Sequence, residues 1–516
     1  MKNPDPRALV LRAAAGAAIC VLLLEAVPAG AQNPVQEQTD LQAMAAKVDR
    51  MQRQLDATEH ELEDSRAAIA DLRRQMQALS SPLAQPAAAS PAAPEDFNAL
   101  RQAVADLREE QSVEQSEIAV HEQAKVETRS RYNLKTGGLV LFNAFQNSGR
   151  VDNIDVPVIA EVRMAGASHG ANGATLRQSL ITLDATGPQF AGAHTYANLQ
   201  LDFFGGLSTA DYTSTAGTLR MRSASILTEW PGWRIHAGLE RLLVAQSSPT
   251  SYATVGEPAL AWSGNLWAWV PQLTAEKTFG IRDSSRFSLA AALIDVPDPG
   301  PGASPYTRAA SAAEQSRYPG SEARAGYAWG SARPGTFGIG GYISPHHYGV
   351  NGSIDAWAGL LDWNIALPAH FAFSGSAYNG QALGGLGGGA FKDIVTTYQY
   401  GHSTALAEAA APYYRAQGLH DAGGWSQVKF QPRGWVELNA AFGHDDALAS
   451  QLRQAYGTAT DPYSTLARNQ TFLGNAIFRP RASFLLSLEY RKLRSWPLSS
   501  KVNEADIVGL AAGYEF

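Results

Sequence analysis

Polar and charged residues recur at even spacings within several short stretches of the sequence. They are Asn198, Gln200, Asp202, Arg220, Arg222, His236, Glu240, Glu437, Asn439, Glu489 and Arg491. Residues two positions apart lie on the same face of a β-strand, so each stretch predicts one polar face. Carboxylate, guanidinium and amide groups on such a face can replace the hydration shell of a passing solute or ion. This chemistry is reversible binding, in which no covalent bond is made or broken.

Three motifs raise the alternative of catalysis, metal binding or phosphate binding. His346-His347 and His444-Asp445-Asp446 lack the spacing of a zinc-binding helix or of a serine nucleophile, and we expect them in solvated loops. The run Gly384–Gly389 is not followed by the Lys-Ser/Thr pair of a phosphate-binding loop, which predicts a flexible loop. We therefore expect no catalytic residue, no metal ion and no cofactor.

Apolar residues alternate with the polar ones and must face a different environment. In the stretch 505–516, Val508, Leu510, Tyr514 and Phe516 share one strand face, and the other face is small or polar. A soluble sheet buries such a face against a second layer. A membrane barrel turns it to lipid, with aromatic residues at the interfaces. A last strand ending in Phe is similar to the terminal strand of bacterial outer-membrane barrels.

Sixteen strands are predicted after residue 132, and short and long connections alternate between them. Their approximate ranges are 136–147, 175–186, 194–204, 218–229, 233–244, 270–281, 286–296, 322–329, 335–345, 353–366, 370–381, 423–432, 434–444, 470–479, 482–495 and 505–516. This alternation predicts a sixteen-stranded antiparallel up-and-down transmembrane β-barrel over 132–516, with short periplasmic turns and long outer loops. Sixteen strands leave a water-filled lumen, whereas eight would be filled by side chains.

One hairpin conflicts with strict alternation. A two-residue turn between Trp230 and Trp233 places Arg220 and Arg222 on the same face as the apolar Ile235. Either a β-bulge shifts the register, or these arginines lie near the outer rim of the barrel. The sequence leaves both alternatives open.

The N-terminal residues 1–31 predict a secretory signal peptide. Basic residues precede the apolar run 13–24, and small residues at 29–31 form a cleavage site. The only cysteine, Cys20, lies in this segment, so we expect none in the exported protein. No later segment is long and apolar enough for a membrane helix, so we expect a membrane to be crossed only by a closed barrel. Charged residues are 17% of the chain and carry no basic excess, which argues against nucleic-acid binding.

Residues 32–79 predict a periplasmic coiled coil. Two series of core positions alternate at spacings of three and four residues: Leu41, Val48, Leu55, Leu62, Ile69 and Met76, and Met44, Met51, Thr58, Ser65, Leu72 and Leu79. A coiled coil needs partner chains, which predicts an oligomer, and these core residues leave two and three strands open. A Pro/Ala linker at 80–94 and a second helical segment at 95–131 follow.

Four segments resemble those of the DcaP-like trimeric porins and the related phosphate-selective porins of Gram-negative outer membranes. They are L-R-Q-S-L-I-T-L-D-A-T-G-P (176–188), Y-A-N-L-Q-L-D-F-F-G-G (196–206), L-R-M-R-S-A-S (219–225) and S-G-N-L-W-A-W-V-P-Q-L (263–273). The resemblance implies a sixteen-stranded barrel, a homotrimer and passive diffusion of small, often anionic, solutes. It also implies that the third outer loop, at about 245–270, folds into the pore.

The constriction candidates in that loop are Trp262, Trp267 and Trp269. They depart from the arginines that an electrostatic constriction would use. The tryptophans could form a track on which sugars stack, or they could pack the loop against the barrel wall.

These patterns together predict an outer-membrane porin for small hydrophilic solutes, surrounded by lipid and without enzymatic activity. Two alternatives stay open. In the first, the coiled coil tethers the barrel to the cell wall or to a periplasmic partner; deletion of 32–131, followed by conductance and envelope-integrity measurements, would distinguish it. In the second, the chain is an outer-membrane lipase, which would need Ser and His on the lipid-facing side of adjacent strands. The predicted strands show no such pair.

Overall fold

The computed structural model describes residues 133–516, except 208–216, 283, 298–308, 331–332, 400–412, 455–461 and 499–500. The predicted signal peptide, coiled coil, linker and second helical segment lie outside the described residues. Within the part of the chain that is described, no helix is long and apolar enough to cross a membrane.

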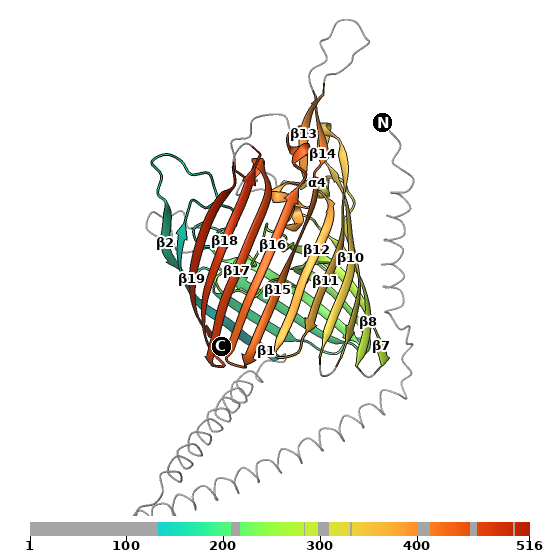
Figure 1. The fold of residues 1–516 in the computed structure, drawn as a ribbon. Helices are drawn as coiled ribbons and strands as arrows, with labels where there is room; N and C mark the ends of the chain where they lie inside the picture. Colours follow the sequence, from blue (N-terminus) through green and yellow to red (C-terminus); the bar gives the residue numbers. More distant parts are fainter. Residues whose placement is uncertain are drawn as a thin grey trace, which may run out of the picture. The chain divides into compact units, whose positions relative to one another are not determined.

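The described chain is dominated by antiparallel strands in a closed sheet (Figure 1). The strands of this sheet are β1 (Asn133–Ser148), β2 (Gly170–Thr175), β3 (Leu180–Thr186), β4 (His194–Asp202), β5 (Arg220–Trp230), β6 (Trp233–Arg241), β7 (Trp269–Arg282), β8 (Ser285–Ile294), β9 (Gly320–Trp329), β10 (Gly335–His347), β11 (Ser353–Ala366), β12 (Phe371–Gln381), β15 (His420–Arg433), β16 (Val436–Ala447), β17 (Leu466–Arg481), β18 (Phe484–Pro497) and β19 (Asn503–Glu515). β2 and β3 both pair with β1, each later strand of the sheet pairs with the one before it, and β19 pairs with β1 to close the wall.

The wall has sixteen strand positions because β2 and β3 share one. β2 pairs with the upper part of β1, from Asn143 to Ser148, and β3 pairs with the lower part, from Asn133 to Leu139. All sixteen predicted strands are present, and the prediction of a sixteen-stranded antiparallel barrel is confirmed. The predicted strand 175–186 was wrong in one respect, because residues 176–179 interrupt it.

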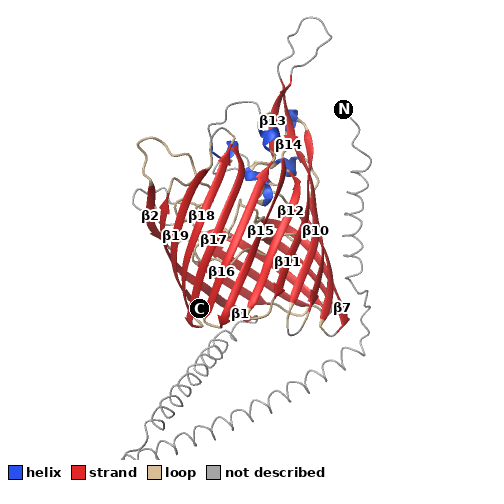
Figure 2. Cartoon of the chain, viewed as in Figure 1, coloured by secondary structure: helices blue, strands red, loops and turns tan. Residues whose placement is uncertain are grey.

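Short turns gather at one end of the barrel and long loops at the other (Figure 1). The short turns include 231–232, 434–435 and 482–483, and the long loops include 149–169, 203–219, 242–268, 295–319, 382–419 and 448–465. The long loops hold the short helices α4 (Ala312–Gln315), α5 (Ala449–Leu452), α6 (Pro462–Thr465), η2 (Gly384–Leu386) and η3 (Gly389–Phe391), as Figure 2 shows. A hairpin of β13 (Ile394–Gln399) and β14 (Tyr413–Gly418) extends from the loop after β12, and η1 (Gly349–Asn351) joins β10 to β11.

The apolar strand faces point outward. Along β18, Phe484, Leu486 and Leu488 are exposed, whereas Leu485 and Ser487 between them are buried. The same alternation occurs on β1, β16 and β19. Large apolar side chains therefore cover the outside of the cylinder, as an outer-membrane barrel requires. They do not gather between two layers, as they would in a soluble sandwich.

The apolar band on the outside of the barrel is bounded by charged residues at the end nearer the long loops. Four adjacent strands carry them at their outward positions nearest that end: Asp446 on β16, Arg468 on β17, Lys492 and Arg494 on β18, and Glu504 and Asp506 on β19. They pair across the strands, as in Arg468–Asp446 at 2.8 Å and Arg494–Glu504 at 2.9 Å. Since hydrocarbon offers charges no partners, this row indicates the level at which the lipid headgroups begin.

Candidate functional site

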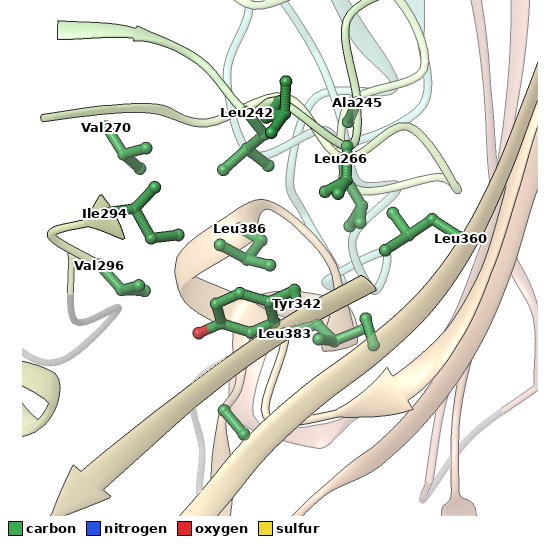
Figure 3. Close-up of a cluster of buried hydrophobic side chains, with 14 of the residues drawn as sticks. Leu242, Ala245, Leu266, Val270, Ile294, Val296, Tyr342, Leu360, Leu383 and Leu386 are labelled. Atoms are coloured by element: carbon green, nitrogen blue, oxygen red, sulfur yellow. The ribbon is translucent and has the colours of Figure 1, made fainter. Parts of the chain in front are cut away.

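The loop between β6 and β7, residues 242–268, lies inside the barrel, and we refer to it as the inner loop. Its first four residues, Leu242 to Ala245, are buried. Leu242 belongs to a cluster that includes Tyr342 of β10 and Leu360 of β11 on the inner wall (Figure 3). Apolar packing therefore fixes the start of the inner loop against one side of the barrel.

Inward-facing amide side chains hold the middle of the inner loop against the opposite wall. Asn143 of β1 donates its Nδ2 to the carbonyl of Tyr252 at 2.7 Å, and Asn475 of β17 donates to the carbonyl of Thr250 at 2.8 Å. Gln427 of β15 accepts from the backbone N–H of Thr250 at 2.7 Å. The inner loop thus crosses the barrel interior. This confirms that the third outer loop folds inward, as the resemblance implied.

Gln178 is a loop-holding residue that the sequence analysis missed. It lies in the interruption between β2 and β3, is fully buried, and donates its Nε2 to the carbonyl of Ala253 at 3.0 Å. Its Oε1 accepts from the N–H groups of Val255 and Gly256. An amide can satisfy both donors and acceptors of a buried backbone, which an ionised side chain cannot do. In the sequence, an Asn or Gln at an inward position is the signal that would indicate a residue holding a loop.

Arg220 and Arg222 face the inside of the barrel because β5 contains a bulge. Gln200 pairs with Ser223 but its neighbour Leu201 pairs with Met221, so Arg222 is the extra residue. The bulge is the first of the two alternatives left open by the sequence, and it turns both arginines inward. Their guanidinium groups lie 2.6 and 3.7 Å from the carboxylate of Asp202.

These arginines also support the inner loop. Arg220 donates its Nη2 to the carbonyl of Gly256 at 2.7 Å, and Arg222 donates to the carbonyl of Val255. Asp202 is fully buried beneath them. A buried carboxylate between two guanidinium groups fixes their direction, so the tip of the inner loop meets a rigid partner.

The other residues predicted to line the interior fall into two groups. Those that are buried are Asp202, Glu437, Asn439, Glu489 and Arg491. Those that keep some exposure are Asn198, Gln200, Arg220, Arg222, His236 and Glu240. Two of the buried residues support loops: Glu489 accepts from the Ser251 hydroxyl at 2.6 Å, and Arg491 donates to the carbonyl of Pro157 at 3.1 Å. Contact of either group with a passing solute stays a prediction.

Charges of both signs line the interior of the barrel. A cavity of about 340 Å³ at the wall of β6–β11 includes Arg324 and Asp362, which pair at 2.6 Å. His236 and Glu240 lie 2.6 Å apart, and Lys429 and Glu437 lie 2.9 Å apart. Such pairs compensate one another, and they do not form a ring of one sign that would strongly select ions.

The three predicted constriction tryptophans contact one another and other protein side chains. Trp262 stacks on Phe391 with ring centroids 3.8 Å apart, and it meets Trp267 edge-on at 5.7 Å. Trp269 is the first residue of β7, and the Arg222 guanidinium lies 4.6 Å from its ring centroid. Because these ring faces are already in contact with the protein, the packing role is favoured over a track for sugars.

Two expectations about solvated loops were wrong. His444, Asp445 and Asp446 lie in strand β16, and Asp445 is fully buried on its inward face. His346 lies in β10 and is also buried. Asp445 and His346 occupy inward positions of β16 and β10. Asp445 accepts from the backbone N–H of Ala390, and His346 lies 3.8 Å from Asp393. No group of three or more His, Cys, Asp or Glu side chains in the described ranges is arranged to hold a metal ion.

A Ser–His pair does occur on adjacent strands, contrary to the sequence analysis. His347 at the end of β10 lies opposite Ser353 at the start of β11, and its Nδ1 is 2.8 Å from the Ser353 Oγ. Both share the outward parity of their strands with the exposed Ile339 and Leu361. The predicted strand ended at 345 and excluded the histidine, which is why the pair was missed.

The inner loop carries one carboxyl group with a shifted pKa. Burial raises the pKa of Glu257 from 4.5 to about 7, the negative charge of nearby Asp152 raises it further, and Arg220 lowers it in part. Burial also raises the pKa of Asp152 in the loop 149–169, against backbone hydrogen bonds from Val158 and Ile159 that lower it.

The Glu257→Gln variant is expected to stabilise the folded barrel at about pH 8 and to have a much smaller effect at about pH 5. The folded protein keeps the Glu257 proton up to about pH 7, whereas the unfolded chain releases it near 4.5. The free energy of unfolding of the natural protein therefore falls as the pH rises between these values and stays lower above them. Thermal unfolding in detergent at both pH values measures this difference. Equal stabilisation at the two pH values would contradict it.

Comparisons with known proteins connect this fold to outer-membrane channels. No protein-family model matches the chain, and no curated protein matches its sequence. Among solved structures, the outer membrane channel DcaP of Acinetobacter baumannii matches 75% of this chain and 99% of its own, with 14% identity and a TM-score of 0.51. An anion-selective porin from Comamonas acidovorans matches 75% of this chain and 100% of its own, with 10% identity and a TM-score of 0.46. The chain therefore has the fold of a Gram-negative outer-membrane porin.

Proposed function

We propose that the protein is an outer-membrane porin through which small hydrophilic solutes, anions among them, diffuse passively. The observation that supports this most directly is the course of the inner loop. It is hydrogen-bonded from β1 to β15 and β17 across the interior of a closed sixteen-position barrel. A loop held in this way narrows a lumen that sixteen strands would otherwise leave wide.

Passage through such a lumen needs polar groups that replace water around the solute. We assign this role to the inward residues that keep some exposure, with Asn198, Gln200, His236 and Glu240 nearest the hydrated wall of β4–β6. The process needs no cofactor and forms no covalent intermediate. Since the inward charges are of both signs and largely paired, the preference for anions is expected to be weak.

Single-channel recording of the purified, folded protein in a planar bilayer tests this function. The expected result is ohmic current steps in groups of three, as a trimer of independent pores would give. A salt gradient across the bilayer gives a reversal potential whose sign reports whether anions or cations pass more easily. Folded protein that inserts into the bilayer and carries no current would contradict the proposal.

We also propose a homotrimer in the outer membrane, with the coiled coil at 32–79 in the periplasm. The support for an oligomer is the heptad pattern, since a coiled-coil seam needs partner chains. A tether to the cell wall or to a periplasmic protein would use the same segment and is compatible with conductance.

A lipase activity is not favoured, although Ser353 and His347 are in contact. Within the described residues, the His347 ring has no further hydrogen-bond partner that would orient it as a base. A serine nucleophile needs an oriented base, and its base is in turn oriented by a third group. Hydrolysis of phospholipid by the natural protein, lost in the Ser353→Ala variant, would revive this alternative.

A further inference from the structure

The loop after β12 contributes a second stretch to the barrel interior. Residues 382–393, which we call the inner segment, precede the β13–β14 hairpin and include η2 and η3. All nine residues from Ala382 to Ala390 are buried. The sequence predicted a flexible loop here, and this was wrong.

The glycines of the inner segment permit close packing. A Cβ atom at Gly385 would lie 2.3 Å from the carbonyl oxygen of Pro297, and one at Gly387 would lie 2.7 Å from the Trp267 side chain. The missing side chains thus allow the backbone to approach the loop after β8 on one side and the inner loop on the other. The high glycine content of the inner segment therefore reflects tight contact with neighbouring loops, and not the flexibility that the sequence predicted.

The inner segment and the inner loop form one continuous contact. The backbone N–H of Trp267 donates to the carbonyl of Leu386 at 3.1 Å, and Leu386 and Leu383 lie in the same apolar cluster as Leu242 (Figure 3). Further along, Phe391 stacks on Trp262 with an interplanar angle of 17°. Two loops from different parts of the wall therefore meet inside the barrel.

Two buried aspartates hold the inner segment in place. Asp421 of β15 accepts from the N–H of Gly389 at 2.7 Å, and Asp445 of β16 accepts from the N–H of Ala390 at 3.0 Å. The Tyr378 hydroxyl donates to the second oxygen of Asp445 at 2.5 Å. Both aspartates are buried, so these hydrogen bonds attach the backbone of the inner segment to β15 and β16 away from water.

The backbone at this attachment is strained. Ala390 has φ 44° and Phe391 has φ 71°, which are values in the left-handed region that residues other than glycine rarely adopt. Such conformations persist only where the surroundings impose them. The aspartates supply part of that constraint, and Lys392 supplies another part by donating its Nζ to the carbonyls of Ala390, Tyr463 and Leu466.

We propose that the inner segment is a second constriction of the pore, held by Asp421 and Asp445 and joined to the inner loop through the Phe391–Trp262 contact. This rests on the proposed porin function and adds a second element that sets the width of the pore. Removal of either the attachment or the aromatic contact then widens the path for solutes.

The test compares the single-channel conductance and the size cut-off for polyethylene glycols of the Asp445→Ala and Phe391→Ala variants with those of the natural protein. Both variants are expected to raise the conductance about 1.5- to 2-fold and to admit larger polymers. The double variant is expected to exceed the larger single effect only slightly, because both changes release the same contact.

Two control variants match these changes outside the interior. Asp506→Ala removes an outward carboxylate that accepts from the Tyr490 hydroxyl at 2.6 Å, as Asp445 does from Tyr378. Phe371→Ala removes one ring of a stacked pair at 4.5 Å with Phe430. Both are expected to conduct like the natural protein.

The outcomes separate the two proposals. If the interior variants fold and conduct like the natural protein, the second constriction is wrong and the porin function stands. If the natural protein itself carries no current, the porin function fails. Heat-modifiable migration in gels confirms that each variant has folded before it is recorded.

Discussion

The Leu361→Arg variant is expected to lose about 2–4 kcal/mol of the free energy of folding into a membrane. Leu361 is 41% exposed on the outside of β11 and lies opposite Ile339 of β10 and Ala377 of β12. Trp357 and Trp363 lie on the same strand face, one on each side of it. Leu361 therefore lies within the apolar band, between two interface-type residues, where a guanidinium group has no polar partner.

Asn364→Arg is the matched control for this change. Asn364 lies three residues further along the same strand on the opposite face, and it lines the hydrated cavity at β6–β11. A guanidinium group there reaches water, so folding into lipid vesicles at graded urea concentrations is expected to match the natural protein. Equal loss of stability in both variants would show that the outside of β11 does not face lipid.

The alternation of residue types predicted the barrel because only strand geometry is needed to interpret it. Val508, Leu510 and Tyr514 are predicted on one apolar strand face, and the structure exposes all three on the outside of the wall. Each strand of a barrel has one face toward the lumen and one toward lipid, so its residue pattern can be interpreted without knowing which strands are adjacent to it.

The features that the sequence analysis missed depend on contacts between distant segments. Gln178 interrupts the second predicted strand to reach the inner loop, more than seventy positions away. Arg222 forms a bulge between β4 and β5, and the sequence only raised that alternative. The glycine run that includes Gly387 was expected to be flexible. The missing side chain of Gly387 instead allows Trp267 to pack against the backbone. Local spacing carries no information about such partners, and tertiary packing decides them.

The dependence on contacts between distant segments also explains why some of the predicted interior residues are buried and others keep some exposure. Parity assigned Glu489 and Arg491 to the inside, but it could not show that Ser251 and Pro157, from two different loops, would cover them. Asn143 and Asn475 likewise form hydrogen bonds to the backbone of the inner loop. A sequence pattern therefore predicts the inside of a porin better than it predicts the solute path.

Excision of residues 246–265, with a short Gly/Ser bridge in their place, is expected to raise the single-channel conductance about two- to fivefold. The remaining Leu242, Ala245 and Leu266 belong to one buried cluster, so the bridge joins segments that the wall already holds (Figure 3). Asn143 and Asn475 lose their partners in the inner loop and gain water, so their amides stay hydrogen-bonded. The barrel is therefore expected to fold.

Gln178→Ala is a milder change to the same loop than this excision. It keeps the inner loop but removes hydrogen bonds to Ala253, Val255 and Gly256, so the loop is expected to fluctuate and the current to become noisier, with a smaller rise in its mean. If the excised protein conducts like the natural one, the inner loop lies beside the solute path and does not narrow it. Because the excision also removes Trp262, the stacking partner of Phe391, the same result would contradict the role proposed for the Phe391–Trp262 contact.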